Sequence, residues 1–115
     1  MADIVIWHNP RCSKSRQTLA LLGERGLAPQ VRLYLRDAPG EAEIRAVLQA
    51  LGRPARDLVR HREPLSGELG LTPDSSEDSL IAAMAAHPVL IERPVVIAGP
   101  RAALGRPPEA VLALF

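Results

Sequence analysis

The stretch that decides the fold is IVIWHNPRCSKSRQTLALL, residues 4–22. Its first four residues, Ile4–Trp7, form a short apolar run rich in β-branched side chains, which predicts a buried strand. Pro10 ends that strand, because proline cannot donate a hydrogen bond to a sheet. From Ser13 onward the apolar residues recur at helical spacing, and Gly23 and Gly26 mark the fraying end of the helix. The stretch therefore predicts a strand, a short turn and a helix.

The remaining residues predict a second strand, a helical middle and a hairpin. Val31, Leu33 and Leu35 alternate with polar residues, and a right-handed crossover would place this strand parallel to the first. After it we expect a helix through Ile44–Leu51, a short helix from Pro54 to Val59, a mostly irregular stretch His61–Pro73, a helix through Leu80–Ala85 that Ser75 and Asp78 cap, strands Pro94–Ile97 and Ala102–Leu104, and a closing helix Glu109–Leu114. The prediction is an α/β fold with one mixed sheet, in a single domain over residues 1–115.

Composition narrows the class of protein. The chain has 115 residues, with 14 basic and 13 acidic side chains, and this near-balance argues against a nucleic-acid partner. No apolar run approaches the roughly 18 residues of a membrane span, and the start MADIVIW lacks the features of a secretory signal. The single cysteine excludes an internal disulfide and a cysteine-rich metal site, and it fits a reducing compartment. We therefore expect a cytoplasmic protein without membrane or nucleic-acid partners.

Cys12 is the most informative residue, because it falls between the first strand and the first helix. Unpaired backbone N–H groups and the positive end of the helix dipole meet at that point, and both stabilise a thiolate. Arg11, Lys14 and Arg16 add positive charge, and the same geometry binds oxyanions. The sequence thus predicts a nucleophile beside an anion site. The alternative is that Cys12 is a small buried apolar residue.

Two neighbours of Cys12 bear on its chemistry. His8 lies at the end of the predicted strand, where its ring would be able to face the sulfur, although a packing or surface histidine is the alternative. Ser15 takes the place that a second cysteine has in a Cys-x-x-Cys motif, which excludes a dithiol cycle within one chain. A redox role for Cys12 therefore requires a second thiol from another molecule.

Three arginines lie at positions where a cation is expected only if it has an anionic partner or a function. Arg60 ends the segment Asp57–Arg60, Arg93 precedes a predicted strand, and Arg106 precedes the closing helix, whose dipole disfavours cations at that end. An anionic ligand would explain arginines at these three positions. The alternative is a solvated surface charge, since arginine is the usual basic residue of this chain.

Several segments of the sequence together resemble a known family. His8–Arg16 resembles the active-site loop of the glutaredoxin-coupled arsenate reductase family, which has a thioredoxin-like fold. The resemblance continues over the whole chain, in the segments Leu33–Leu35, Asp57–Arg60, His87–Val96 and Gly105–Glu109. The basic stretch Arg11–Lys14 is more similar to an uncharacterised branch of that family than to its resistance enzymes.

The resemblance implies a role for each candidate residue. Cys12 would attack the arsenic of arsenate, and His8 and Ser15 would tune or hydrogen-bond its thiolate. Three arginines would gather round the oxyanion, namely Arg60, Arg93 and Arg106. Pro94 would be the cis proline of the fold. No metal or bound organic cofactor is implied; glutathione would be a co-substrate and glutaredoxin would reduce the mixed disulfide.

The sequence leaves two other functions open. A thiol oxidoreductase that acts on another oxyanion or thiol adduct would show a reactive Cys12 without arsenate turnover. A regulator that binds RNA polymerase belongs to the same superfamily, but such regulators typically carry a Cys-x-x-Cys switch, which Ser15 removes.

Overall fold

A computed structural model describes residues 3–115, and the chain forms two compact units. The sheet unit consists of the residues up to Asp37 together with Arg93–Phe115, and the helical unit is Ala38–Glu92. The prediction of one domain over residues 1–115 stays a prediction.

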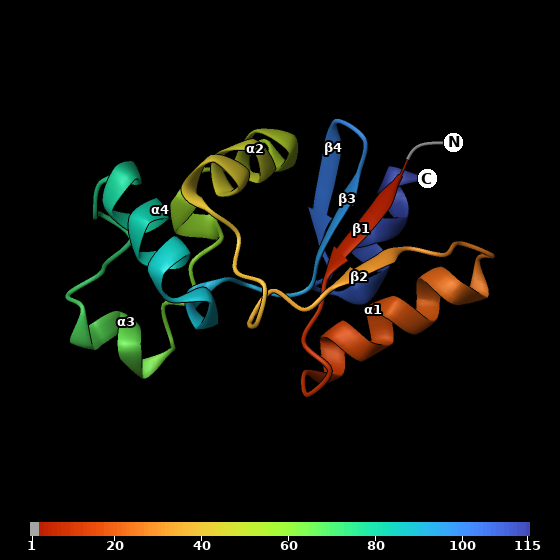
Figure 1. Cartoon of the computed structure of the whole chain (residues 1–115), viewed down its shortest axis with the longest axis horizontal. Coiled ribbons are helices and arrows are strands. Elements are labelled where there is room, and N and C mark those ends of the chain that lie inside the picture. The colour runs from red at the N-terminus through yellow and green to blue at the C-terminus, as the bar shows by residue number, and fades with distance from the viewer. Residues whose placement is uncertain (1–2) are drawn as a thin grey trace. The chain divides into compact units, whose positions relative to one another are not determined.

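The sheet unit is built on four strands in the order β2-β1-β3-β4 (Figure 1). Strand β1 pairs in parallel with β2, whereas the β1–β3 and β3–β4 pairs are antiparallel. Helix α1 connects β1 to β2, as the predicted crossover requires. The mixed sheet and the hairpin therefore confirm the predicted fold class. The strands are β1 (Ile4–Trp7), β2 (Gln30–Arg32), β3 (Val95–Ala98) and β4 (Arg101–Leu104).

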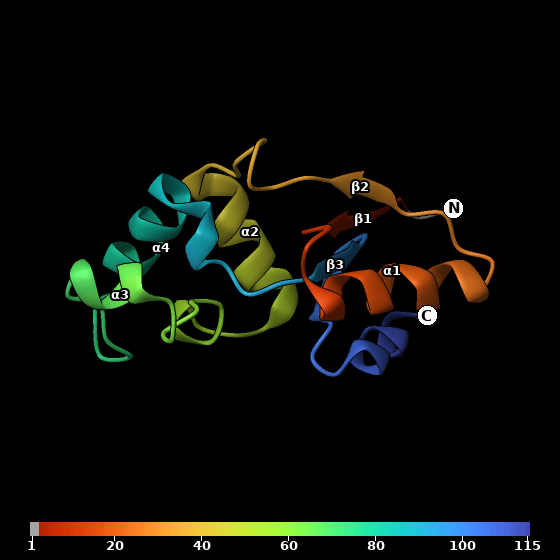
Figure 2. The ribbon, with the colours of Figure 1, turned by 90° about the horizontal axis from the view of Figure 1, so that it is seen from below.

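The core of the sheet unit lies between the sheet and two helices. Helix α1 (Ser13–Glu24) and the 3₁₀ helix η3 (Pro108–Leu114) pack beside one another and against the strands (Figure 2). Four fully buried side chains meet there, one each from β1, α1, β3 and η3: Ile6, Leu22, Val96 and Val111. Burial of such aliphatic side chains is the main stabilising term, at roughly 1.5–3 kcal/mol each.

The helical unit contains five helical segments, and its core is aliphatic. Ile44 of α2 and Leu80, Ile81 and Met84 of α4 are at most 1% exposed. A single antiparallel bridge between Val59 and Ile91 joins the segments that follow η1 and η2. The segments are α2 (Glu41–Leu51), η1 (Ala55–Asp57), α3 (Pro64–Glu68), α4 (Glu77–Ala86) and η2 (Pro88–Leu90).

The second strand is shorter than its alternating pattern predicts. β2 ends at Arg32, whose carbonyl accepts the last ladder bond from the N–H of His8 at 2.9 Å. Beyond that point β1 turns away at Pro10, so β2 has no neighbour to continue the ladder. The N–H groups of Arg36 and Asp37 instead donate to the carbonyl of Leu33. The extension of the strand through Leu35 was wrong for this reason.

The stretch His61–Pro73 is mostly irregular, as predicted, but it also contains the five-residue helix α3, which was not predicted. Pro64 occupies the first helical position, where its fixed φ favours a helix and its missing N–H costs nothing. Gly70, with φ +71°, ends the helix, and the N–H of Leu71 donates to the carbonyl of Ser66 at 2.9 Å. This is a Schellman cap. The proline and the glycine were the available signal.

Two helix ends also differ from the prediction. Ser76, not Ser75, caps α4 by accepting the N–H of Ser79 at 3.1 Å, because Ser75 accepts the N–H of Thr72 in the preceding turn. The closing segment starts at Pro108 and is a 3₁₀ helix rather than an α-helix over Glu109–Leu114. Its bonds span three residues, a tighter winding that short segments commonly adopt.

Candidate functional site

Cys12 stands at the N-cap of α1, as its position in the sequence predicts. A tight turn brings it there: the N–H of Cys12 donates to the carbonyl of Asn9, and the N–H of Arg11 donates to Oδ1 of Asn9, both at 3.0 Å. The N–H of Arg16 then donates to the carbonyl of Cys12 at 3.0 Å and starts the helix. The side chain is buried, with 8% of its surface exposed. The sulfur therefore lies at the positive end of the helix dipole.

The surroundings of Cys12 favour its thiolate. Burial raises the pKa of the thiol, but the N–H of Ser15, the hydrogen bond and charge of Arg93, and the N–H of Lys14 together outweigh it. The net result is a pKa below the ordinary value of a thiol. Because the thiolate is the nucleophile, the site favours attack by sulfur.

Two guanidinium groups lie against the sulfur. Nη2 of Arg106 donates to Sγ of Cys12 at 3.9 Å, and Arg93 acts on the same sulfur as donor and as charge. Nε of Arg106 donates to the carbonyl of Arg93 at 2.8 Å, which holds the two arginines together. Among the described residues, the buried Nε of Arg93 has no hydrogen-bond partner. An unsatisfied buried donor beside a nucleophile is suited to an oxyanion.

Pro94 and Gly105 pack beside this pair of arginines. The Arg93–Pro94 peptide bond is cis, the conformation expected for Pro94, and the Arg106–Pro107 bond is also cis, which was not predicted. A Cβ on Gly105 would lie 2.5 Å from Oγ1 of Thr18 and 2.6 Å from Cγ of Pro94. Only glycine fits there. Gly105 was not predicted as a site residue, because the single signal in the sequence is a glycine directly before Arg106.

His8 and Ser15 form a buried pair. Nδ1 of His8 and Oγ of Ser15 are hydrogen-bonded at 2.7 Å, and the N–H of Asn9 donates to the same Oγ at 3.0 Å. Burial, and then the charge of Arg16, lower the pKa of His8 below its ordinary value. The contact found for the His8 ring is thus Ser15, and Ser15 reaches Cys12 through its backbone N–H. That both residues tune the thiolate stays a prediction.

Arg60 belongs to the helical unit and is held by carboxylates. Its Nη1 lies 2.8 Å from Oε2 of Glu63, and its Nε lies 3.6 Å from Oε1 of Glu92. Nη1 also donates to the carbonyl of Val89 at 3.4 Å. Arg60 is therefore not a freely solvated charge, and an anion would compete with two acidic side chains for it. Its role as an oxyanion ligand stays a prediction.

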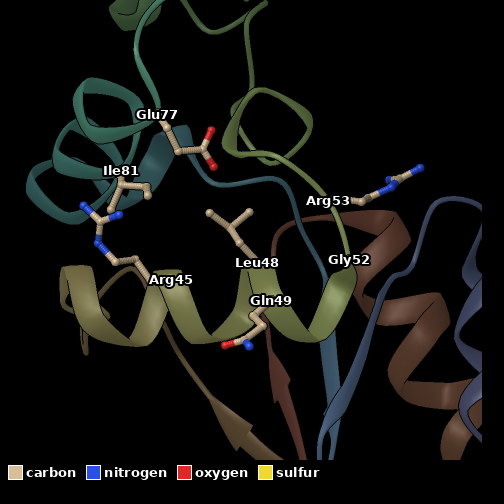
Figure 3. Close-up of a pocket in the computed structure, with 7 residues that line it drawn as sticks. All are labelled: Arg45, Leu48, Gln49, Gly52, Arg53, Glu77 and Ile81. Carbon is tan, nitrogen blue, oxygen red and sulfur yellow. The ribbon is translucent and has the colours of Figure 1, made fainter.

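Each unit also has a groove lined by two arginines. In the sheet unit a groove of about 510 Å³ lies beside the Cys12 loop, and we call it the loop groove; it is lined by His8, Asn9, Pro10, Arg11, Leu33, Leu35 and Arg36. In the helical unit a groove of about 500 Å³ lies between α2 and α4. Figure 3 shows Arg45, Leu48 and Ile81 around this second groove, which we call the helix groove, whereas Gln49 points away from it.

Residues 3–115 contain neither a cluster of metal ligands nor a membrane-spanning helix. No three His, Cys, Asp or Glu side chains gather there as metal ligands would. Of the helices in this part of the chain, none is long and apolar enough to cross a membrane.

Comparisons with known proteins agree with this geometry. The model of the ArsC family matches residues 7–114. The chain is 47% identical to a protein named arsenate reductase from Neisseria meningitidis serogroup A, over the full length of both. It is 51% identical to the uncharacterized protein YfgD of Escherichia coli K12, over 96% of this chain and 94% of that one. A solved arsenate reductase from Vibrio cholerae superposes with a TM-score of 0.95 at 49% identity, covering 99% of this chain and 98% of that one.

Proposed function

Because the chain belongs to the ArsC family, we propose that it is an arsenate reductase, an oxidoreductase whose nucleophile is Cys12. The observation that carries the proposal is the position of one sulfur. It lies at the start of α1 and accepts from Arg106, while Arg93 and the helical N–H groups lower its pKa. A thiolate and guanidinium donors suited to an oxyanion therefore lie together, which supports attack on a tetrahedral oxyanion.

The first step is displacement at arsenic. The thiolate of Cys12 forms a sulfur–arsenic bond, and one arsenate oxygen leaves as water after it takes up protons. Arsenic stays pentavalent in this step. The guanidinium groups of Arg93 and Arg106 stabilise the negative charge that the arsenate oxygens carry, and the free Nε of Arg93 is an available donor.

The second step transfers two electrons. A thiolate from another molecule attacks the sulfur of Cys12, a disulfide forms, and the sulfur–arsenic bond breaks with its electron pair on arsenic. Arsenite is released, and the two sulfurs have been oxidised together. A second external thiol then attacks the mixed disulfide and returns Cys12 to its thiolate.

The external thiols follow from the cysteine count. Since Cys12 is the only cysteine in the sequence, neither reducing equivalent comes from a second thiol of the same chain. We propose glutathione as the first thiol and glutaredoxin as the reductant of the mixed disulfide, as the family resemblance implies. A dependence on reduced thiols fits a cytoplasmic location, which is part of the same proposal.

The test is a reconstituted assay. Purified protein with glutathione, glutaredoxin and arsenate is expected to release arsenite, and omission of glutaredoxin is expected to leave the protein carrying one glutathione, which intact mass spectrometry detects. Cys12→Ser is expected to abolish turnover while the circular dichroism spectrum stays unchanged. Turnover by folded Cys12→Ser would contradict the proposal. Turnover that needs no glutaredoxin would remove that partner alone.

A further inference from the structure

The loop groove is a second site next to the nucleophile, and none of the steps above uses it. Its volume of about 510 Å³ falls within the range of small-molecule sites. One wall is the loop from His8 to Arg11, which leads directly into Cys12, and the other is the turn that follows β2. A molecule in this groove is therefore adjacent to the loop that presents the sulfur.

Besides His8 and Asn9, the loop groove is lined by three apolar residues and two cations. Pro10, Leu33 and Leu35 supply apolar surface, and Leu35 is 44% exposed although it is a large apolar side chain. Arg11 and Arg36 supply positive charge. Within residues 3–115 neither guanidinium has a carboxylate partner. Their neighbour Arg32, by contrast, is paired with Asp37 at 3.3 Å.

Two unpaired cations around an apolar surface fit one kind of ligand. A small molecule with two carboxylates and an uncharged middle would satisfy both arginines and cover the exposed leucine. The proposed reaction needs a thiol from another molecule to attack the Cys12 adduct, because the chain has a single cysteine. A short peptide thiol with free carboxylates meets both requirements.

We propose that the loop groove binds the peptide part of the thiol co-substrate, with its carboxylates on Arg11 and Arg36 and its backbone over Leu33 and Leu35. The inference rests on the proposed function, in which an external thiol attacks the Cys12 adduct. It adds a binding site for that thiol and a selectivity: an acidic peptide thiol is held, whereas a neutral thiol such as 2-mercaptoethanol is not.

Binding is measured without turnover. S-methylglutathione keeps both carboxylates but has no reactive thiol, and titration calorimetry gives its Kd. We expect the Kd to rise roughly two- to fivefold in Arg36→Gln and in Arg11→Gln, and roughly tenfold in the double variant, the size of exposed charge contacts. Arg45→Gln, from the helix groove, is the matched control and is expected to bind like the wild type. Equal binding by the wild type and the double variant would overturn the proposal.

Kinetics give the second readout. Arg36→Gln is expected to raise the KM for glutathione and to leave the KM for arsenate unchanged. With glutathione diethyl ester, whose carboxylates are masked, the wild type and Arg36→Gln are expected to behave alike. If Arg36→Gln instead raises only the KM for glutaredoxin, the groove serves a protein and the proposal is wrong.

Failure of this inference is distinguishable from failure of the proposed function. Cys12→Ser is expected to bind S-methylglutathione like the wild type, because Cys12 is not among the residues that line the groove. Arsenate turnover with equal binding by all variants overturns the groove alone. Binding that depends on Arg36 without arsenate turnover overturns the function alone.

Discussion

The loop groove and the helix groove have nearly the same volume, about 510 and 500 Å³, and each is lined by two arginines. They differ in what those arginines contact. In the helix groove, Nη2 of Arg45 lies 2.7 Å from Oδ1 of Asp78, and Nε of Arg53 lies 3.9 Å from Oδ2 of Asp57. In the loop groove, no described carboxylate pairs with either arginine. Compensation of charge within the chain, and not cavity size, separates the two.

The acidic residue of the helix groove has a structural partner as well. Both carboxylate oxygens of Glu77 accept the N–H of Ala55 at 3.0 Å, which ties η1 to the start of α4 (Figure 3). Leu48 and Ile81 are almost fully buried there. The charged groups of the helix groove thus serve the fold of the helical unit, whereas the two arginines of the loop groove have no described carboxylate partner and are available to a ligand.

The same contrast holds for the predicted oxyanion ligands. Arg93 and Arg106 act on the sulfur of Cys12, and the Nε of Arg93 still lacks a partner in the described part of the chain. Arg60 of the helical unit already contacts Glu63 and Glu92. An arginine that is already paired with carboxylates binds an added anion more weakly than an arginine with a free donor. The reason is that the anion must displace the acidic partners.

The largest expected effect tests that contrast directly. Arg93→Gln is expected to lower kcat/KM for arsenate by roughly 100-fold, the cost of removing one donor from a developing negative charge. Arg60→Gln is expected to lower it by much less. Steady-state kinetics with saturating glutathione and glutaredoxin measures both. An equal loss in the two variants would break the comparison and would place Arg60 among the oxyanion ligands.

The second effect is on stability, and it compares one glycine from each unit, Gly105 and Gly67. Gly105→Ala is expected to lower the free energy of unfolding by about 1–3 kcal/mol, because its Cβ would collide with Thr18 and Pro94. Gly67→Ala, inside α3 and with no atom within 4 Å of its Cβ, is expected to raise it by up to about 1 kcal/mol. Urea unfolding measures both. A stable Gly105→Ala with wild-type activity would show that the packing of Gly105 against Pro94 does not matter for the site.

The third effect is on the pH dependence of Cys12. Its lowered pKa means that the thiolate, and with it the rate of alkylation by iodoacetamide, reaches its plateau at lower pH than for an ordinary thiol near 8.5. Arsenate is expected to slow the alkylation. Arg93→Gln is expected to move the profile to higher pH, and Arg60→Gln to leave it in place. A wild-type profile like that of a free thiol, without protection by arsenate, would return Cys12 to a packing role.

Local patterns predicted most of the elements and the place of the nucleophile. The β-branched run Ile4–Trp7 and the helical spacing after Ser13 are properties of neighbouring residues, and so is the position of Cys12 between them. The errors arose where a neighbour in space decided the outcome. Alternation through Leu35 predicts a strand, but β2 stops at Arg32 because β1 turns away at Pro10.

The sequence by itself determined the order of strands and helices, the exclusion of an internal dithiol, and a thiol at the start of a helix, because each follows from residue types at short spacing. Only the tertiary structure decided which arginines act on that thiol. Antiparallel pairing of β3 with β1 and β4 brings Arg93 and Arg106 to the sulfur from the far end of the chain, whereas Arg60 is compensated by nearby carboxylates. The sequence does not distinguish these arginines by their charge. Whether an arginine is free to bind an anion depends on which acidic side chains the fold places beside it.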